Sequence, residues 1–249
     1  HGDRAHRMER LAEVLDHSLS DGGKVFIPAF SLGRTQEILY ELDRIFSNPE
    51  YQSRFPRLAS GSRPPVFVDS PLALEMTRIY SSLTEFWDEE AKALLKGGDH
   101  PIKFDQLYGI EKHAEHAKLL EVKGPAVIIA GSGMCTGGRI VNHLADGIER
   151  PENDVVFVGY QAAGTPGRTI QGHANGSRTV ALNGKKSNIH AGVHTLSGYS
   201  AHADQLGLLD WVGRMPEKPG RIQMVHGEPK AQKALAAKLV ERGYEVEPF

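Results

Sequence analysis

Short apolar runs alternate with segments of helical periodicity along most of the chain. The runs are rich in β-branched and aromatic residues, and they predict buried strands at Lys24–Phe30, Pro65–Ser70, Ala126–Ala130 and Asp154–Gly159. Helices are predicted between them at Arg34–Phe46, Leu72–Leu95 and Ile140–Ile148. Apolar strands that alternate with helices are typical of a mainly parallel sheet covered on both faces. The pattern therefore predicts an α/β fold.

The pattern changes after about Ser177. Sheet segments are predicted at Thr179–Leu182, Ile189–Leu196 and Arg221–Val225. Helices are predicted at Leu206–Arg214 and Lys230–Arg242. We place a domain boundary after Leu196, with residues 1–196 as one domain and residues 197–249 as a separate C-terminal segment.

The composition limits the partners and the environment of the protein. The 249 residues carry a net charge of −2, so any nucleic-acid surface must be a local patch. A single cysteine, Cys135, excludes a disulfide framework and favours a cytoplasmic protein. No apolar run approaches the roughly 18 residues that a membrane span requires, so no membrane partner is expected.

Three predicted strands lead through glycine-rich turns into helices, at residues 28–35, 131–139 and 159–168. Such turns gather at the carboxyl edge of a parallel sheet, where backbone N–H groups and helix N-termini bind anions. Each turn carries hydroxyl groups and one arginine, which suits the phosphates of a polynucleotide. The residues predicted to contact phosphate are Ser31, Arg34, Ser132, Gly133, Thr136, Gly138, Arg139, Gly164, Thr165 and Arg168.

The alternative is that these turns are ordinary connections of an α/β fold. None of them has the sequence of a P-loop or the glycine spacing of a dinucleotide site, so neither an ATP site nor an NAD site is predicted. Asp69 follows another predicted strand, where it either caps the next helix or faces the same edge. Cys135 has no histidine at metal-ligand spacing beside it, so we interpret it as incidental.

Two histidines near the C-terminus are set among small residues. His202 lies in the string Ser-Ala-His-Ala-Asp, and His226 lies in Val-His-Gly-Glu. An imidazole on such a loop binds a metal or transfers a proton, with Asp204 or Glu228 orienting it. Local hydrogen bonding is the alternative for both histidines, and Asp204 is also a good N-cap for the following helix. The spacing excludes a zinc finger and the His-Glu-x-x-His motif.

Other conspicuous side chains are interpreted as structural. His113 and His116 lie in a polar helical stretch and are predicted to face solvent. Trp87 and Trp211 are predicted to be core residues rather than platforms on which bases stack.

The turns and the two histidine strings together resemble the β-CASP branch of the metallo-β-lactamase superfamily. That branch includes the nuclease subunit of the cleavage and polyadenylation specificity factor and its bacterial homologues. Residues 23–37, 131–139 and 159–165 look like three signatures of a β-CASP domain, and the strings around His202 and His226 are similar to motifs B and C of the family. The resemblance makes residues 1–196 a β-CASP domain and residues 197–249 the C-terminal part of a metallo-β-lactamase αββα domain.

The resemblance implies a zinc-dependent ribonuclease that acts on single-stranded RNA. In the family, two zinc ions activate a water for in-line attack on a phosphodiester. By that likeness His226 would be a zinc ligand, and His202 would be the general acid for the leaving oxygen. The glycine-rich turns would form one wall of an RNA cleft.

The His-x-His-x-Asp-His signature of the family is absent from this sequence. We therefore expect the chain to be truncated at its N-terminus, to bind zinc weakly or not at all, and to be inactive alone. We also expect the C-terminal segment to expose apolar surface, which would favour a homodimer. Two alternatives stay open: a non-catalytic RNA-binding module or inactive scaffold paralogue, and a DNA nuclease of the same branch.

Overall fold

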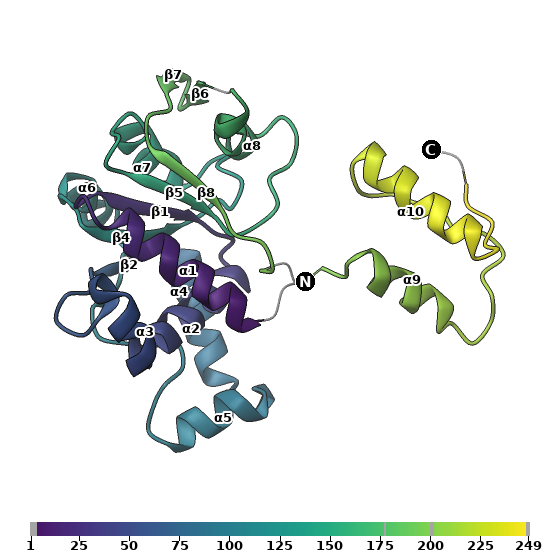
Figure 1. Ribbon diagram of the computed structural model, residues 1–249, viewed down its shortest axis with the longest axis horizontal. Helices are drawn as coiled ribbons and strands as arrows, with labels where there is room; N and C mark the ends of the chain where they lie inside the picture. The colour runs from purple at the N-terminus through teal and green to yellow at the C-terminus, as the bar shows by residue number, and fades with distance from the viewer. Residues whose placement is uncertain (1–3, 177, 200–201, 248–249) are drawn as a thin grey trace. The chain divides into compact units, whose positions relative to one another are not determined.

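The computed structural model describes residues 4–176, 178–199 and 202–247 (Figure 1). The chain divides into two compact units, His1–Tyr199 and Ser200–Phe249, and each is described by itself. The division falls close to the boundary predicted at Leu196.

A six-stranded sheet forms the centre of the first unit, in the order β3-β2-β4-β1-β5-β8. Every neighbouring pair of strands is parallel, which confirms the predicted α/β class. The strands are β1 (Lys24–Pro28), β2 (Val66–Val68), β3 (Leu107–Gly109), β4 (Ala126–Ala130), β5 (Asp154–Phe157) and β8 (Gly192–Thr195).

Helices cover both faces of this sheet, as its continuous apolar strands require. Along β1, Val25 and Ile27 belong to one core cluster and Phe26 to another, because successive side chains point to opposite faces. Figure 1 shows α1 and α2 on one side of the sheet and α7 and α8 on the other. The helices are α1 (Arg4–Ser18), α2 (Arg34–Ser47), α3 (Pro49–Arg54), α4 (Pro71–Ser82), α5 (Glu89–Lys96), α6 (His113–Glu121), α7 (Arg139–Gly147) and α8 (Pro166–Gln171).

The single helix predicted at Leu72–Leu95 is wrong. α4 ends at Ser82, a short 3₁₀ helix follows at η2 (Thr84–Phe86), and α5 begins at Glu89. The new helix starts there because the Asp88 side chain accepts a hydrogen bond from the N–H of Ala91 and caps it.

A short antiparallel hairpin, β6 (Thr179–Leu182) and β7 (Lys185–Asn188), forms a second sheet. Its turn residues Asn183 and Gly184 have φ values of 50° and 76°. Asparagine and glycine tolerate this left-handed conformation, which two-residue hairpin turns require. The hydrophobic pattern predicts β6 but not β7, because β7 is mostly polar.

The second unit contains α9 (Gln205–Gly213) and α10 (Pro229–Glu241). Its buried core consists of Leu209, Val212 and Leu239. The strand predicted at Arg221–Val225 is wrong: in the described part of this segment only Ile222 forms a bridge, to Val246. In neither unit does a described helix have the length and apolar content needed to cross a lipid bilayer.

Candidate functional site

The glycine-rich turns meet at the carboxyl edge of the sheet, because β1 lies between β4 and β5. Two hydrogen bonds join the turn after β4 to the segment after β5. The Gly167 N–H donates to the Met134 carbonyl over 3.1 Å, and Gln161 Nε2 donates to the Gly133 carbonyl over 2.9 Å. The structure therefore brings these two predicted phosphate-contacting turns into one region.

Two glycines of this region leave no room for a side chain, Gly133 against the Phe30 ring and Gly138 against backbone. A Cβ on Gly133 would lie 2.8 Å from Phe30 Cδ2, and a Cβ on Gly138 would lie 2.4 Å from the Gly131 carbonyl oxygen. Gly138 also has a φ of 74°, which glycine adopts without the steric cost that other residues incur. The turns are thus held in one conformation by contacts that a side chain would break.

The N-termini of α2 and α7 lie at this edge without a side-chain cap. Backbone carbonyl oxygens of the turns accept from these N–H groups in place of a capping side chain. The Thr35 N–H donates to Phe30 O over 3.2 Å, and the Ile140 N–H donates to Gly131 O over 3.0 Å. These donors are therefore used within the protein. What the two helices still offer an anion is the partial positive charge of their dipoles.

The three arginines of the turns also have partners within the protein. Arg34 Nη1 lies 2.6 Å from Glu37 Oε2, and Arg168 Nη1 donates to the Gln161 carbonyl over 2.9 Å. Arg139 donates to the Asp69 carboxylate over 2.8 Å and to two backbone carbonyls of the segment after β3. Phosphate contact by these three side chains stays a prediction.

Hydroxyl groups at the turn after β4 face solvent more directly. Ser132 Oγ lies 3.2 Å from Thr136 Oγ1 and accepts a hydrogen bond from the Thr136 N–H over 3.0 Å. Ser132 is half-buried, whereas Thr136 is exposed. If Ser132 donates to Thr136, the Thr136 hydroxyl proton is left for an external acceptor such as a phosphate oxygen.

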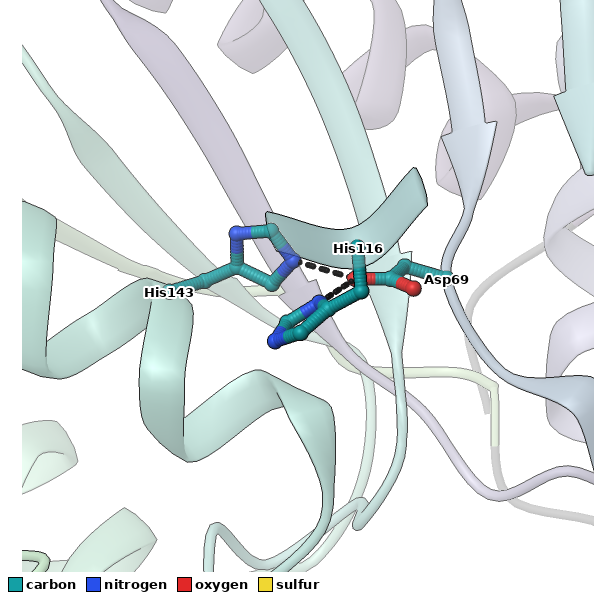
Figure 2. Close-up of side chains that lie close together, drawn as sticks. All are labelled: Asp69, His116 and His143. Atoms are coloured by element: carbon teal, nitrogen blue, oxygen red, sulfur yellow. Dashed lines mark hydrogen bonds and ion pairs between the residues drawn. The ribbon is translucent and has the colours of Figure 1, made fainter. Parts of the chain in front are cut away.

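A buried polar cluster holds the end of β2 against α6 and α7 (Figure 2). His116 Nδ1 and His143 Nε2 each lie 2.6 Å from the same oxygen of Asp69, Oδ2. The other oxygen, Oδ1, accepts from Arg139. The Asp69 side chain is 0% exposed and those of His116 and His143 are 2% and 1% exposed, so this carboxylate depends on these partners for stabilisation.

The neighbours of the cluster determine where its protons lie. Asn142 accepts from Asn183 through Oδ1 and therefore donates through Nδ2 to His116 Nε2, which leaves the His116 proton on Nδ1. Burial lowers the pKa of His143, although the Asp69 carboxylate opposes that shift. Burial alone would raise the pKa of Asp69, but the hydrogen bonds from His143, His116 and Arg139 bring it below its usual value. Asp69 is therefore ionised and accepts from a neutral His143 at neutral pH.

The same cluster places three metal-ligand atoms within 4.8 Å of one another, the one such group among the described residues. Zinc ligands bound at about 2.0–2.1 Å in a tetrahedral site lie about 3.3 Å apart. The 2.6 Å separations around Asp69 Oδ2 are shorter and are typical of charge-assisted hydrogen bonds. Arg139 already balances the carboxylate charge. The geometry fits a hydrogen-bonded network that positions Arg139 and the turn before α7.

The two C-terminal histidine strings lie in the second unit. His202 and His226 are both exposed. Asp204 caps α9, because its Oδ1 accepts from the Gly207 N–H over 2.8 Å, as its structural interpretation predicts. Glu228 occupies the N-cap position of α10 without a side-chain capping bond.

His226 lines a cavity of about 490 Å³ in the second unit. Apolar side chains such as Leu208, Met224 and Leu235 form much of its wall, and no other histidine, cysteine or acid is among its described lining residues. A tetrahedral zinc site needs about three or four protein ligands. The described residues around His226 supply one ligand and do not complete such a site.

Three interpretations of individual residues change with the structure. His116 was predicted to face solvent and is buried, because its ring reaches Asp69. Trp211, predicted to lie in the core, is 65% exposed on α9. Asp69 does not cap α4, since Ser70 supplies the cap, and its buried carboxylate contacts Arg139 of the turn before α7.

Two further buried residues of this region are Cys135 and His143. Burial raises the pKa of the Cys135 thiol to about 12, so it stays protonated, in keeping with an incidental role. His143 was not singled out from the sequence. A signal was present, because His143 shares one face of a helix with the apolar residues Ile140 and Leu144 and must be buried with them.

Comparison with known protein families shows which family the chain belongs to. Residues 35–170 match the family described as the Beta-Casp domain. The chain belongs to the β-CASP family. Residues 186–247 match a second family, described as the Zn-dependent metallo-hydrolase RNA specificity domain. The two matches cover the glycine-rich turns at residues 131–139 and 159–168 and both histidine strings.

Named relatives are longer than the chain. It is 40% identical over 252 aligned positions to Ribonuclease TTHA0252 of Thermus thermophilus, covering 99% of the chain and 54% of the relative. It is 32% identical over 237 positions to Transcription termination factor FttA of Pyrococcus horikoshii, covering 93% of the chain and 34% of that relative. The chain therefore spans about half the length of the first relative and about a third of the second.

Proposed function

We propose that this protein hydrolyses phosphodiester bonds in RNA, and that the first unit provides an RNA-binding edge. The meeting of the glycine-rich turns at one sheet edge is the observation that carries the proposal. Membership of the β-CASP family and similarity to a protein named as a ribonuclease support it.

The contacts of the edge suggest how RNA is held. Phosphate oxygens lie near the N-termini of α2 and α7, where helix dipoles favour negative charge. Hydroxyl donors come from Ser31 and from the Ser132–Thr136 pair, whereas the Thr165 hydroxyl donates to the Ala162 carbonyl over 2.7 Å. Arg168, which donates to the Gln161 carbonyl, adds positive potential near phosphate, while Arg34 and Arg139, each paired with a carboxylate, hold the turns in place. Gly133, Gly138 and Gly164 allow close backbone approach.

Zinc belongs to the second part of the proposal. His226 contributes one ligand to a zinc site whose other ligands lie outside the described residues, and the name of the second matching family supports zinc. His202 protonates the leaving oxygen, while Asp204 and Glu228 orient the two histidine loops. The 249-residue chain alone is then inactive. Homodimerisation and a cytoplasmic location stay predictions.

A non-catalytic RNA-binding module is the second candidate. One observation favours it for the chain alone: in the described part of the second unit, His226 has no companion metal ligand in its cavity. A DNA nuclease is the third candidate, since contacts to phosphate do not distinguish the two sugars.

Cleavage assays on the complete gene product separate these candidates. We expect wild-type protein with zinc to cut single-stranded RNA and not the matched DNA. His202→Ala should lower the cleavage rate by about 10²–10⁴-fold with little change in RNA affinity. His113→Ala, an exposed histidine on α6, is the control and should cleave normally. Binding of RNA without turnover would support the module instead, and preferential cleavage of DNA the third candidate.

A further inference from the structure

A polar cavity lies beside α1 at the end of the edge strand β8. Its volume is about 250 Å³. The described residues that line it are His6, Arg7, Arg10, Thr195, Leu196 and Ser197. None of them is an acid, and none belongs to the glycine-rich turns. The cavity is therefore a concentration of donors and positive charge that the proposed function does not yet use.

The local structure explains why these side chains converge. His6 and Arg10 are four residues apart on α1, so they lie on the same helical face. Thr195 and Ser197 are two residues apart at the end of β8, a spacing that places both on one side of an extended chain. β8 is an edge strand, so within the described part of the chain no further strand pairs with it on this side of the sheet.

Arg7 forms a fixed wall of the cavity. Its guanidinium lies 2.8 Å from Glu37 Oε1, its Nε donates to Glu41 Oε1 over 2.7 Å, and its Nη1 donates to the Gly198 carbonyl over 2.6 Å. Two carboxylates therefore balance the charge of Arg7. It shapes the cavity more than it attracts a ligand.

Arg10 is the cation that remains available. Its side chain is exposed, and within the described ranges no carboxylate pairs with it. Thr195 Oγ1 already accepts a hydrogen bond from Gln171 Nε2 over 3.2 Å, so its own proton is left for an external acceptor. An unpaired guanidinium beside hydroxyl donors is the arrangement that binds phosphate oxygens.

We propose that this cavity binds a phosphate group, with Arg10 as its main cation and Thr195 and Ser197 as hydroxyl donors. The same chemistry fits an internal phosphodiester of RNA, a 5′-terminal phosphate or free inorganic phosphate. For the two RNA sources the proposal rests on the proposed function. A phosphate held here adds a contact to RNA separate from the glycine-rich edge.

The test measures binding by the 249-residue chain to three probes. These are a short single-stranded RNA with a 5′-phosphate, the same RNA with a 5′-hydroxyl, and inorganic phosphate. Arg10→Ala should weaken binding about tenfold and reduce the salt dependence of RNA binding by about one charge. Arg10→Lys should restore part of the affinity, because it keeps the charge and loses the planar fork. Lys118→Ala, an exposed cation on α6, is the control and should change binding less than about twofold.

The probes for which Arg10→Ala loses affinity identify the source of the phosphate. Equal loss for both RNAs indicates an internal phosphodiester, loss confined to the phosphorylated RNA indicates the terminal phosphate, and loss confined to inorganic phosphate indicates the free anion. Wild-type binding of inorganic phosphate without RNA binding would refute the RNA-binding edge and leave the cavity standing. If Arg10→Ala binds all three probes as the wild type does, or if no probe binds the wild type, the cavity is not a phosphate site.

Discussion

Two pairs of histidines, one pair in each unit, lie in opposite environments. In the first unit, His116 and His143 are buried and donate to one carboxylate, Asp69. In the second unit, His202 and His226 are exposed on loops, and the described residues of that unit include three buried apolar side chains. A buried imidazole with fixed partners stabilises a fold, whereas an exposed one on a loop can reach a ligand. The comparison separates the histidines that hold the edge in place from those proposed to act on RNA.

The largest expected effect comes from removing the charge at the centre of the buried cluster. Asp69→Asn should lower the free energy of unfolding by about 3–5 kcal/mol, because it removes the charge that balances Arg139 and puts an NH2 donor where one carboxylate oxygen accepted. Urea unfolding at neutral pH measures it. Asp105→Asn is the control, since that side chain is 95% exposed. If Asp69→Asn and Asp105→Asn are equally stable, the cluster does not stabilise the fold.

A smaller effect is expected from the glycines of the edge. Gly138→Ala should cost about 2–4 kcal/mol, because its Cβ would meet the Gly131 carbonyl at 2.4 Å in addition to the strain of a positive φ. Gly164→Ala is the matched control: its φ is 83°, but nothing lies within 4 Å of its Cβ, so only strain of about 1 kcal/mol remains. If both variants unfold at the same urea concentration, close approach at Gly138 does not matter.

Asp43 is also a buried acid, but it differs from Asp69 in its hydrogen bonding. Its Oδ2 has no partner within the described part of the chain. Burial, with a contribution from Asp99, raises its pKa to about 7. Its protonated form therefore favours folding below pH about 4, and that contribution is lost as the pH rises through 7.

Asp43→Asn should accordingly raise the free energy of unfolding by about 1–3 kcal/mol at pH 8 and by almost nothing near pH 3.5. The difference between variant and wild type, followed by urea unfolding across this range, gives the titration directly. A variant less stable than the wild type at pH 8 would show that the charged form has a partner.

Much of the first unit could be predicted because its strands are continuous apolar runs and its turns carry glycine. β4 has the predicted bounds, and the turns meet because adjacent parallel strands end at one edge. The buried cluster could not be predicted in the same way. Asp69 and His143 are 74 residues apart, and nothing in the polar stretch around His116 shows that its ring is buried. Such contacts depend on tertiary packing rather than on local pattern.

The second unit was less predictable for a different reason. Its helices follow from apolar periodicity, but Trp211 and Val225 are 65% and 85% exposed. A unit with few buried partners does not obey the rule that large apolar residues lie inside. This exposure agrees with the expectation of apolar surface in the C-terminal segment.

Zinc content of the complete gene product tests the division between the two kinds of histidine most directly. The measurement compares bound zinc per chain in His226→Ala and His143→Ala with the wild type. We expect His226→Ala to lose zinc while its unfolding midpoint in urea, compared with that of the wild type in the absence of zinc, is unchanged, and His143→Ala to keep zinc while it unfolds more easily. Wild-type zinc content in His226→Ala, or loss of zinc in a folded His143→Ala, would contradict the account.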